Sequence, residues 1–245
     1  MALNRGAIGF FLKITCLLLL LTGITGLGGS FLLHKYRVYG LFFSNLYIIF
    51  PALLAVISGA VLFITGSIGC LVSSKKPSCG HGLFVYFLII VFCVVGTTAA
   101  LAYFYQGKLD AELAPLKDVF QNYSNNSQDP ETKAVDGLQS ELQCCGVMNY
   151  TDWLQTPWFN HSGKYEVPQS CCNTTFHSCN GTLDAPMLLY NEACQIKLKE
   201  LLLLVVHIIH ITSLVVLVLL VLSWITVGQL MRYPVPQEYR ILDQD

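Results

Sequence analysis

Charged residues are scarce in this chain, and their scarcity excludes several classes of protein. Only 12% of the 245 residues are charged, and the formal net charge at pH 7 is -1. A soluble domain usually carries about twice that charged share, and a nucleic-acid-binding domain carries a basic excess, so we expect neither. The sequence also lacks a recognisable Ser–His–Asp triad, paired carboxylates in an apolar setting and a glycine-rich phosphate loop. We therefore expect no catalytic residues and no enzyme.

Apolar residues make up 54% of the chain and gather in four runs. Each run reaches the roughly 20 residues that cross a bilayer as a helix. A signal peptide is the alternative for the first run, but the run is too long and contains Lys13. We expect an all-α membrane protein, a four-helix transmembrane bundle with a disulfide-stapled, mostly helical loop between spans three and four. The expected segments are an N-terminal tail (1–7), first span (8–33), small outer loop (34–45), second span (46–72), inner loop (73–82), third span (83–105), large outer loop (106–200), fourth span (201–227) and C-terminal tail (228–245).

Small residues recur at heptad spacing in the first two spans. Small side chains let helices approach closely in lipid, where no hydrophobic force drives them together. The two series therefore predict close helix contacts within the bundle. They are Thr15, Thr22 and Gly29 in the first span, and Ala52, Gly59 and Gly66 in the second.

Six cysteines gather in the polar region between the third and fourth spans. Adjacent cysteines do not easily bond each other, because disulfide geometry would be strained, so each vicinal pair must reach distant segments. A small loop domain buries little apolar surface, and disulfides are the expected compensation in an oxidising compartment. Spacing alone does not choose among the many pairings. The six are Cys144, Cys145, Cys171, Cys172, Cys179 and Cys194.

Glycosylation sequons give the orientation. Six occur, all between the third and fourth spans, which places that loop outside the cell or in an organelle lumen. Arg5, Arg232, and Lys75 and Lys76 in the short loop favour a cytoplasmic side for both termini. The expected glycosylation sites are Asn122, Asn125, Asn149, Asn160, Asn173 and Asn180.

Four cysteines lie in or beside the apolar runs. Cys16, Cys70 and Cys79 lie near the expected cytoplasmic face, where cysteines are candidates for palmitoylation, whereas Cys93 lies deeper. The alternative is that they are small, buried and inert side chains.

Histidines offer two further candidate sites. His207 and His210 share one face of the fourth span, where they either sense pH or bond a neighbouring helix. His161 and His177 lie near Cys179 in the outer loop, but a disulfide is the expected fate of that cysteine, so we predict no metal site.

The C-terminal tail contains a tyrosine, two further residues and then a bulky apolar residue, in Tyr239-Arg240-Ile241-Leu242. Tyr239 and Leu242 match the loose pattern of sorting motifs that clathrin adaptors bind as extended peptides. This pattern predicts cycling through endosomes or lysosomes.

Motifs along essentially the whole chain resemble the tetraspanin family, and its six-cysteine subgroup in particular. The family order, a small outer loop first and a large one second, matches this chain. The resemblance implies the disulfides Cys144–Cys194, Cys145–Cys171 and Cys172–Cys179. The motifs that carry it are Cys144-Cys145-Gly146, the Asn-Tyr-Thr-Asp-Trp stretch at 149–153, the Pro-x-Ser-Cys stretch at 168–171, Cys194, and the glycine-containing signature at 59–70.

The chain departs from the family pattern inside the membrane. Thr15 stands near the position where members usually carry Asn, and Thr97 and Thr98 are the polar residues of a third span without the usual acid. His207 and His210 occupy the fourth span. The polar layer between the helices is therefore expected to differ.

The resemblance implies a membrane organiser that binds other membrane proteins in cis, clusters with other tetraspanins and lipid, and holds cholesterol between its spans. We expect it at the plasma membrane, in endosomes or lysosomes, or in both. A channel or transporter is the alternative, but apart from Lys13 the spans lack the charged residues of an ion path. A four-span junction protein would place its large loop first, so that class ranks last.

Overall fold

The computed structural model describes residues 5–35, 37–43, 50–74, 80–109, 113–162, 165–176 and 178–232. The chain forms two compact units. We call the first the bundle; it comprises Met1–Phe31, Ala52–Ala100 and Ile209–Asp245. We call the second the head; it comprises Leu32–Pro51 and Leu101–Ile208.

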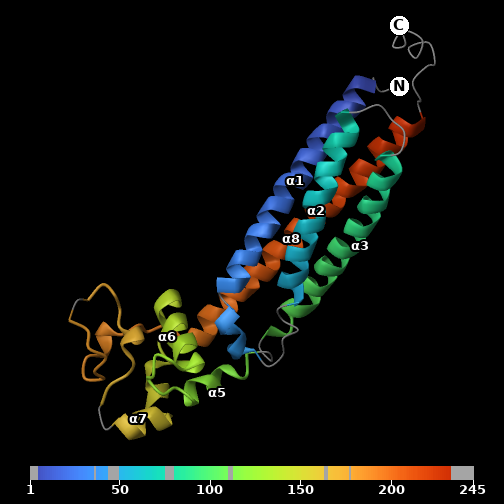
Figure 1. The fold of residues 1–245 in the computed structure, drawn as a ribbon. Coiled ribbons are helices and arrows are strands. Elements are labelled where there is room, and N and C mark those ends of the chain that lie inside the picture. Colours follow the sequence, from blue (N-terminus) through green and yellow to red (C-terminus); the bar gives the residue numbers. More distant parts are fainter. Residues whose placement is uncertain are drawn as a thin grey trace, which may run out of the picture. The chain divides into compact units, whose positions relative to one another are not determined.

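The described part of the chain contains four long helices, as predicted: α1 (Arg5–Lys35), α2 (Phe50–Ser74), α3 (Gly80–Gln106) and α8 (Cys194–Arg232) (Figure 1). Each contains a stretch long and apolar enough to cross a membrane. A helix suits these runs because it satisfies every backbone polar group internally, which hydrocarbon cannot do. The predicted fold class is confirmed. The stretches are Gly9–Phe31, Ala52–Leu71, Gly82–Gln106 and Cys194–Gln229.

Helix α8 begins before the apolar run of the fourth span. It starts at Cys194 and includes Lys197, Lys199 and Glu200. At 39 residues, α8 is longer than the roughly 20 that a bilayer requires. Its first turns, which belong to the head, are therefore an extension of the membrane helix by charged residues.

Glycines bring α1 and α2 into close contact. A Cβ atom added to Gly26 would lie 2.8 Å from the Cα of Gly59, and one added to Gly23 would lie 2.6 Å from the backbone nitrogen of Phe63. Both predicted glycines of α2 take part, since Gly66 packs against Leu20. Backbone against backbone is the closest approach that two helices can make, and glycine permits it because it has no side chain.

The α1 side of this contact differs from the predicted series. A Cβ atom added to Gly29 would meet only a side-chain methyl of Val56, at an ordinary contact distance of 3.7 Å, and Thr22 hydrogen-bonds carbonyls of its own helix. Gly23 and Gly26 make the approach instead. A heptad series identifies a helix face only approximately, because an α-helix has 3.6 residues per turn.

The bundle core combines apolar side chains of all four long helices. Phe92 of α3 and Trp224 of α8 stack with ring centroids 5.1 Å apart. The wider set shares complete or nearly complete burial and consists of Leu12, Cys16, Leu19, Leu62, Phe84, Leu88, Val91, Val95, Val216, Leu220 and Val227.

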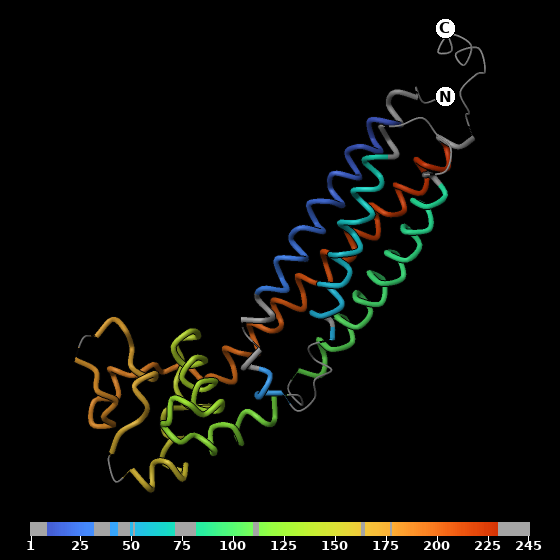
Figure 2. Tube along the Cα trace, viewed as in Figure 1, coloured from blue at the N-terminus to red at the C-terminus, as the bar shows by residue number. Residues whose placement is uncertain are grey.

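The head is built from short elements: η1 (Arg37–Phe42), α5 (Leu116–Gln121), α6 (Pro130–Leu142), η3 (Tyr150–Gln155), α7 (Pro157–Ser162), η4 (Gln169–Cys171) and η5 (Pro186–Leu188). Helix α6 begins with residues typical of a helix N-terminus: Asp129 is extended before it, Pro130 takes its first position and Glu131 lies in its first turn. Between α7 and α8 the trace is mostly turns, with isolated bridges pairing Glu166 with Thr182 and Cys172 with Leu189 (Figure 2).

The small outer loop contributes to the head core. Phe42, at the end of η1, is completely buried and packs in the same cluster as Leu116 of α5 and Leu138 of α6. Segments that are far apart in the sequence thus share one core.

Candidate interaction head

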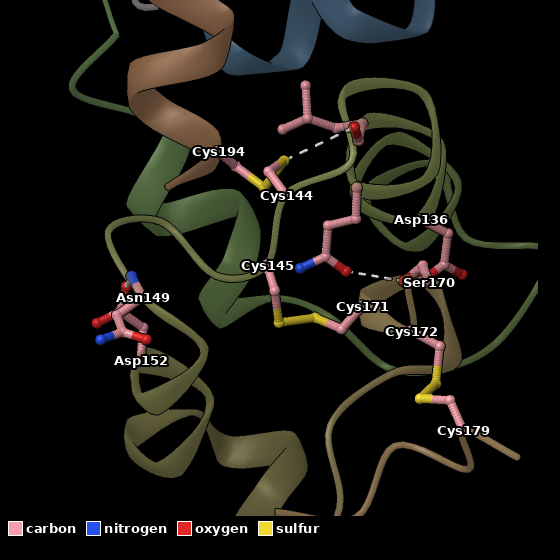
Figure 3. The surroundings of a disulfide bond; sticks show 12 residues. Asp136, Cys144, Cys145, Asn149, Asp152, Ser170, Cys171, Cys172, Cys179 and Cys194 are labelled. Atoms are coloured by element: carbon pink, nitrogen blue, oxygen red, sulfur yellow. Dashed lines mark hydrogen bonds between the residues drawn. A yellow bond between two sulfur atoms is a disulfide. The ribbon is translucent and has the colours of Figure 1, made fainter. Parts of the chain in front are cut away.

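Three disulfides cross-link the head (Figure 3). They join Cys144 to Cys194, Cys145 to Cys171 and Cys172 to Cys179, the pairs that the family resemblance implies. The four sulfur-bearing residues of the first two bridges are completely buried, whereas Cys172 and Cys179 are only partly buried. The vicinal cysteines at 144–145 therefore tie one point of the chain to the start of α8 and to η4.

The turn after Cys145 has a backbone that only glycine accommodates. Gln143 ends α6 in the left-handed region, and Gly146 follows with φ 73°. A Cβ atom on Gly146 would clash with the carbonyl oxygen of Asn149. The left-handed conformation and this missing atom together explain the glycine of the Cys-Cys-Gly motif.

The same turn caps helix α8. The carbonyl oxygen of Gly146 accepts from the N–H of Cys194 at 3.2 Å, and that of Val147 accepts from the N–H of Gln195 at 3.0 Å. The first N–H groups of a helix have no partner within the helix itself. The Cys-Cys-Gly turn thus satisfies these groups at the point where the Cys144–Cys194 bridge is attached.

The Asp152 carboxylate fixes the backbone of residues 148–149, between the Cys-Cys-Gly turn and η3. Its Oδ2 accepts from the backbone N–H groups of Met148 at 2.6 Å and of Asn149 at 3.0 Å. An ionised acceptor makes such hydrogen bonds stronger than neutral ones. The carboxylate therefore orders the entry to η3.

An aromatic cluster packs around Trp153 of η3. Trp153 is 0% exposed, and its ring centroid lies 5.0 to 5.7 Å from those of Phe120, Tyr123 and Trp158. These edge and tilted geometries suit the charge distribution of aromatic rings. The cluster joins α5, η3 and α7, which are too short to be stable alone.

A largely buried polar network, which the sequence pattern did not reveal, connects α6 and η4 with Tyr123, which follows α5. Asp136 Oδ1 accepts from the hydroxyls of Tyr123 at 3.1 Å and Ser170 at 2.8 Å. Burial, reinforced by the neighbouring Asp136 carboxylate, raises the pKa of Tyr123 above its ordinary value. The signal available in the sequence was the spacing of Asp136 and Gln139, three residues apart on the face of α6 that also carries its apolar stripe.

Gln139 completes this network. Its side chain is completely buried, its Oε1 lies 2.8 Å from Ser170 Oγ, and its Nε2 has no partner. One hydroxyl proton cannot serve both Asp136 and Gln139. Turning the amide over resolves the conflict, because Nε2 then donates to Ser170 Oγ and Ser170 donates to Asp136. The hydroxyl of Ser170, the serine of the Pro-x-Ser-Cys motif, thereby both donates and accepts a hydrogen bond.

The segment after α7 displays apolar side chains on a cross-linked frame. Val167 N–H donates to the Gly181 carbonyl oxygen at 2.8 Å, and Gly181 has φ 79°. Tyr165, Phe176 and Met187 are 59%, 44% and 77% exposed. We call these three residues the apolar head surface. Side chains of this size that stay exposed on an ordered frame are candidates for contact with another protein.

All six expected glycosylation sites lie in the head. Five of the asparagines are exposed, and Asn173 is partly buried. Asn173 Oδ1 accepts from the backbone and hydroxyl of Thr175, and Asn180 Oδ1 does the same with Thr182. The exposed positions leave room for an attached sugar.

The bundle places the other candidate cysteines in different surroundings. Cys16 is completely buried beside Gly69, Cys70 is partly buried and Cys93 is exposed. Cys79, and Tyr239 and Leu242 of the expected sorting motif, lie outside the described residues. Cys16 is thus a packing residue of the α1–α2 contact in this structure.

The candidate histidines also lie in different surroundings. His210 Nδ1 donates to the Ala99 carbonyl oxygen of α3 at 3.2 Å, the helix-bonding role that was one of the two alternatives, whereas His207 is exposed. In the head, His161 Nδ1 lies 2.7 Å from the Pro157 carbonyl oxygen. His177 lies outside the described residues, among which no group of histidine, cysteine, aspartate and glutamate side chains is arranged to hold a metal ion.

Four membrane-length helices, with a head stapled by three disulfides between the third and the fourth, define a multi-pass membrane protein with one large ordered loop. The profile of the Tetraspanin family matches residues 8–231. The chain belongs to the tetraspanin family.

Characterised relatives agree with this assignment. Tetraspanin-36 of Danio rerio is 35% identical over 175 residues, which is 71% of each chain. CD151 antigen of Rattus norvegicus is 35% identical over 133 residues, 52% of each chain, and CD82 antigen of the same species is 32% identical over 117 residues, 47% of this chain and 44% of that one. Membership of this family supports a role in organising membrane proteins.

Proposed function

We propose that the protein binds other membrane proteins laterally through its head and assembles them into membrane microdomains with further tetraspanins and lipid. The observation that carries this proposal is the apolar head surface, Tyr165, Phe176 and Met187, on a segment between disulfides. A cross-linked segment has little conformational entropy left to lose on binding, so more of its contact energy appears as affinity.

The proposed orientation places the head outside the cell or in an organelle lumen. Disulfides persist on that side of the membrane, and six sequons confined to the head support the same orientation. Both termini then lie in the cytoplasm, where Tyr239 and Leu242 are available to a clathrin adaptor. This arrangement leads us to propose residence at the plasma membrane, in endosomes or lysosomes, or in both.

Lipid attachment is proposed at Cys70 and Cys79, near the cytoplasmic ends of their segments. Cys70 is only partly buried, whereas acylation of Cys16 would require the contact with Gly69 to open. An apolar groove of about 290 Å³, lined by residues that include Phe92, Leu217 and Val221, supports binding of an apolar lipid such as cholesterol to the bundle.

Two features of the bundle argue against the alternative of a channel or transporter. Lys13 is exposed on α1, away from the bundle core, and His210 is bonded to the α3 backbone. The apolar spans therefore place few ionisable groups where an ion path needs them.

Proximity labelling of the full-length protein in cells tests the proposal. Met187→Glu combined with Phe176→Glu should remove most labelled membrane partners, because both side chains are exposed and a buried interfacial charge is costly. Ser140→Glu on α6 is the matched control, since Ser140 is exposed and outside this surface. An unchanged partner set at equal surface level would move recognition away from the apolar head surface.

A further inference from the structure

The head contains a pocket of about 300 Å³ that the proposed partner surface does not use. It lies between α5, the turn after Gly146, η3 and the first turn of α8. Leu113 and Phe120, both buried, supply apolar lining, and Val147 adds to it. The volume falls at the lower end of small-molecule sites, so the pocket suits a compact group.

The polar lining favours a neutral ligand rich in hydroxyl and amide groups. Gln121, Gln155 and Gln195 each offer an amide that both donates and accepts hydrogen bonds. Lys117 and Asp152 also line the pocket, and their opposite charges leave it without a net preference for anion or cation. Hydroxyls need donors and acceptors side by side, and the apolar faces of a sugar ring or an acetamido methyl fit the apolar lining.

Two sequons adjoin lining residues of this pocket in the sequence. Asn149 directly follows the lining residue Met148 and precedes the lining residue Asp152 by three positions, and Figure 3 shows Asn149 beside Asp152. Asn122 directly follows the lining residue Gln121. Asn149 is the better placed, because lining residues flank it on both sides.

We propose that the pocket binds the first sugars of the N-linked glycan attached to Asn149 of the same chain. The inference rests on the proposed function, whose orientation of the head exposes its sequons to glycosylation. A tethered ligand is present at a millimolar effective concentration, so a half-open pocket of weak affinity is sufficient. The docked glycan then bridges α5, η3 and α8, and none of the three residues of the apolar head surface is among the lining residues.

The test uses the full chain, produced in glycosylating cells and kept in mild detergent. Glycopeptide mass spectrometry first measures occupancy at each sequon, and the rate of glycan release by a peptide-N-glycosidase is then followed site by site. Asn160, exposed on α7, is the internal control because it is not among the lining residues. If the glycan is docked for about four-fifths of the time, release at Asn149 is about fivefold slower than at Asn160. After denaturation the two rates become equal.

A pocket-filling variant distinguishes docking of the glycan in the pocket from other causes of slow glycan release at Asn149. Ala114 is exposed and lines the pocket, so Ala114→Trp should fill it and raise the rate at Asn149 to that at Asn160. Lys133→Trp, exposed on α6 outside the pocket, should leave the rate slow.

Three results would overturn the inference. They are an unoccupied Asn149, equal native rates at Asn149 and Asn160, and slow release that Ala114→Trp does not restore. Loss of labelled partners in Ala114→Trp without a change in release rate would assign the pocket to a protein instead. The partner proposal fails separately, through the Met187→Glu and Phe176→Glu variant.

Discussion

The bundle and the head reach order by opposite means. In the bundle each long helix satisfies its own backbone, and the helices need only close contacts such as that of Gly26 with Gly59. In the head the elements are too short to persist alone, so covalent bridges, an aromatic cluster and a buried polar network hold them together. The solvent explains the difference, because water competes for the backbone of a short helix and hydrocarbon does not.

Cysteine illustrates the contrast within one residue type. Cys16 of the bundle is buried as a small packing side chain, whereas Cys145 of the head is buried as half of a bridge. Burial alone therefore does not distinguish the two roles. What distinguishes them is that Cys145 is covalently bonded to Cys171, whereas Cys16 forms no disulfide.

The largest expected effect tests how much of the head depends on its bridges. Replacing both Cys145 and Cys171 by serine should destabilise the head by about 3–4 kcal/mol from loop entropy, and by more because two hydroxyls become buried. Replacing both Cys172 and Cys179 removes a bridge across a sequence separation of only 7 and should cost about 2 kcal/mol. Hydrogen exchange measured peptide by peptide resolves head and bundle separately.

The bundle peptides should keep their protection from exchange in both serine variants, because the bridges lie in the head. Equal loss of protection in bundle and head would show that the two units do not differ in what holds them. Equal destabilisation by the two variants would contradict the ranking of the bridges.

A glycine substitution tests whether the close contact between α1 and α2 holds the bundle together. Gly26→Leu should cost about 1–3 kcal/mol, since its side chain meets the Gly59 backbone with no room to yield. Gly28→Leu, two positions along the same helix, meets nothing within 4 Å and should be nearly neutral. Thermal unfolding in detergent should separate the two variants, with head disulfides intact in both. Similar midpoints would refute the assigned α1–α2 contact.

The smallest expected effect concerns the buried polar network. Ser170→Ala leaves Asp136 and Gln139 without a shared partner and should destabilise the head by about 1–3 kcal/mol, toward the lower end because Asp136 keeps Tyr123. Ser140→Ala is the control, because the Ser140 hydroxyl bonds only carbonyls of its own helix. Chemical denaturation at neutral pH, followed by hydrogen exchange of α6, measures both. Equal stability of the two variants would mean that the network only fills space.

Much of the candidate head could be predicted, for local reasons. Asp129, Pro130 and Glu131 start α6 because their preferences are those of a helix N-terminus. The six sequons and the vicinal cysteines stand in the sequence itself. The Tyr123–Asp136–Ser170 network was missed, since Ser170 lies 34 residues from Asp136 and no periodic pattern links them.

The sequence by itself determined the four membrane helices, the position of the large loop and the family, because apolar run length and short motifs are local properties. Only the tertiary structure decided that Gly23 and Gly26 make the α1 contact, that Cys16 is buried and that Gly146 caps α8. These outcomes depend on which surfaces meet in space. Packing between segments that are distant in the sequence decides which surfaces meet, and local sequence patterns carry no information about that packing.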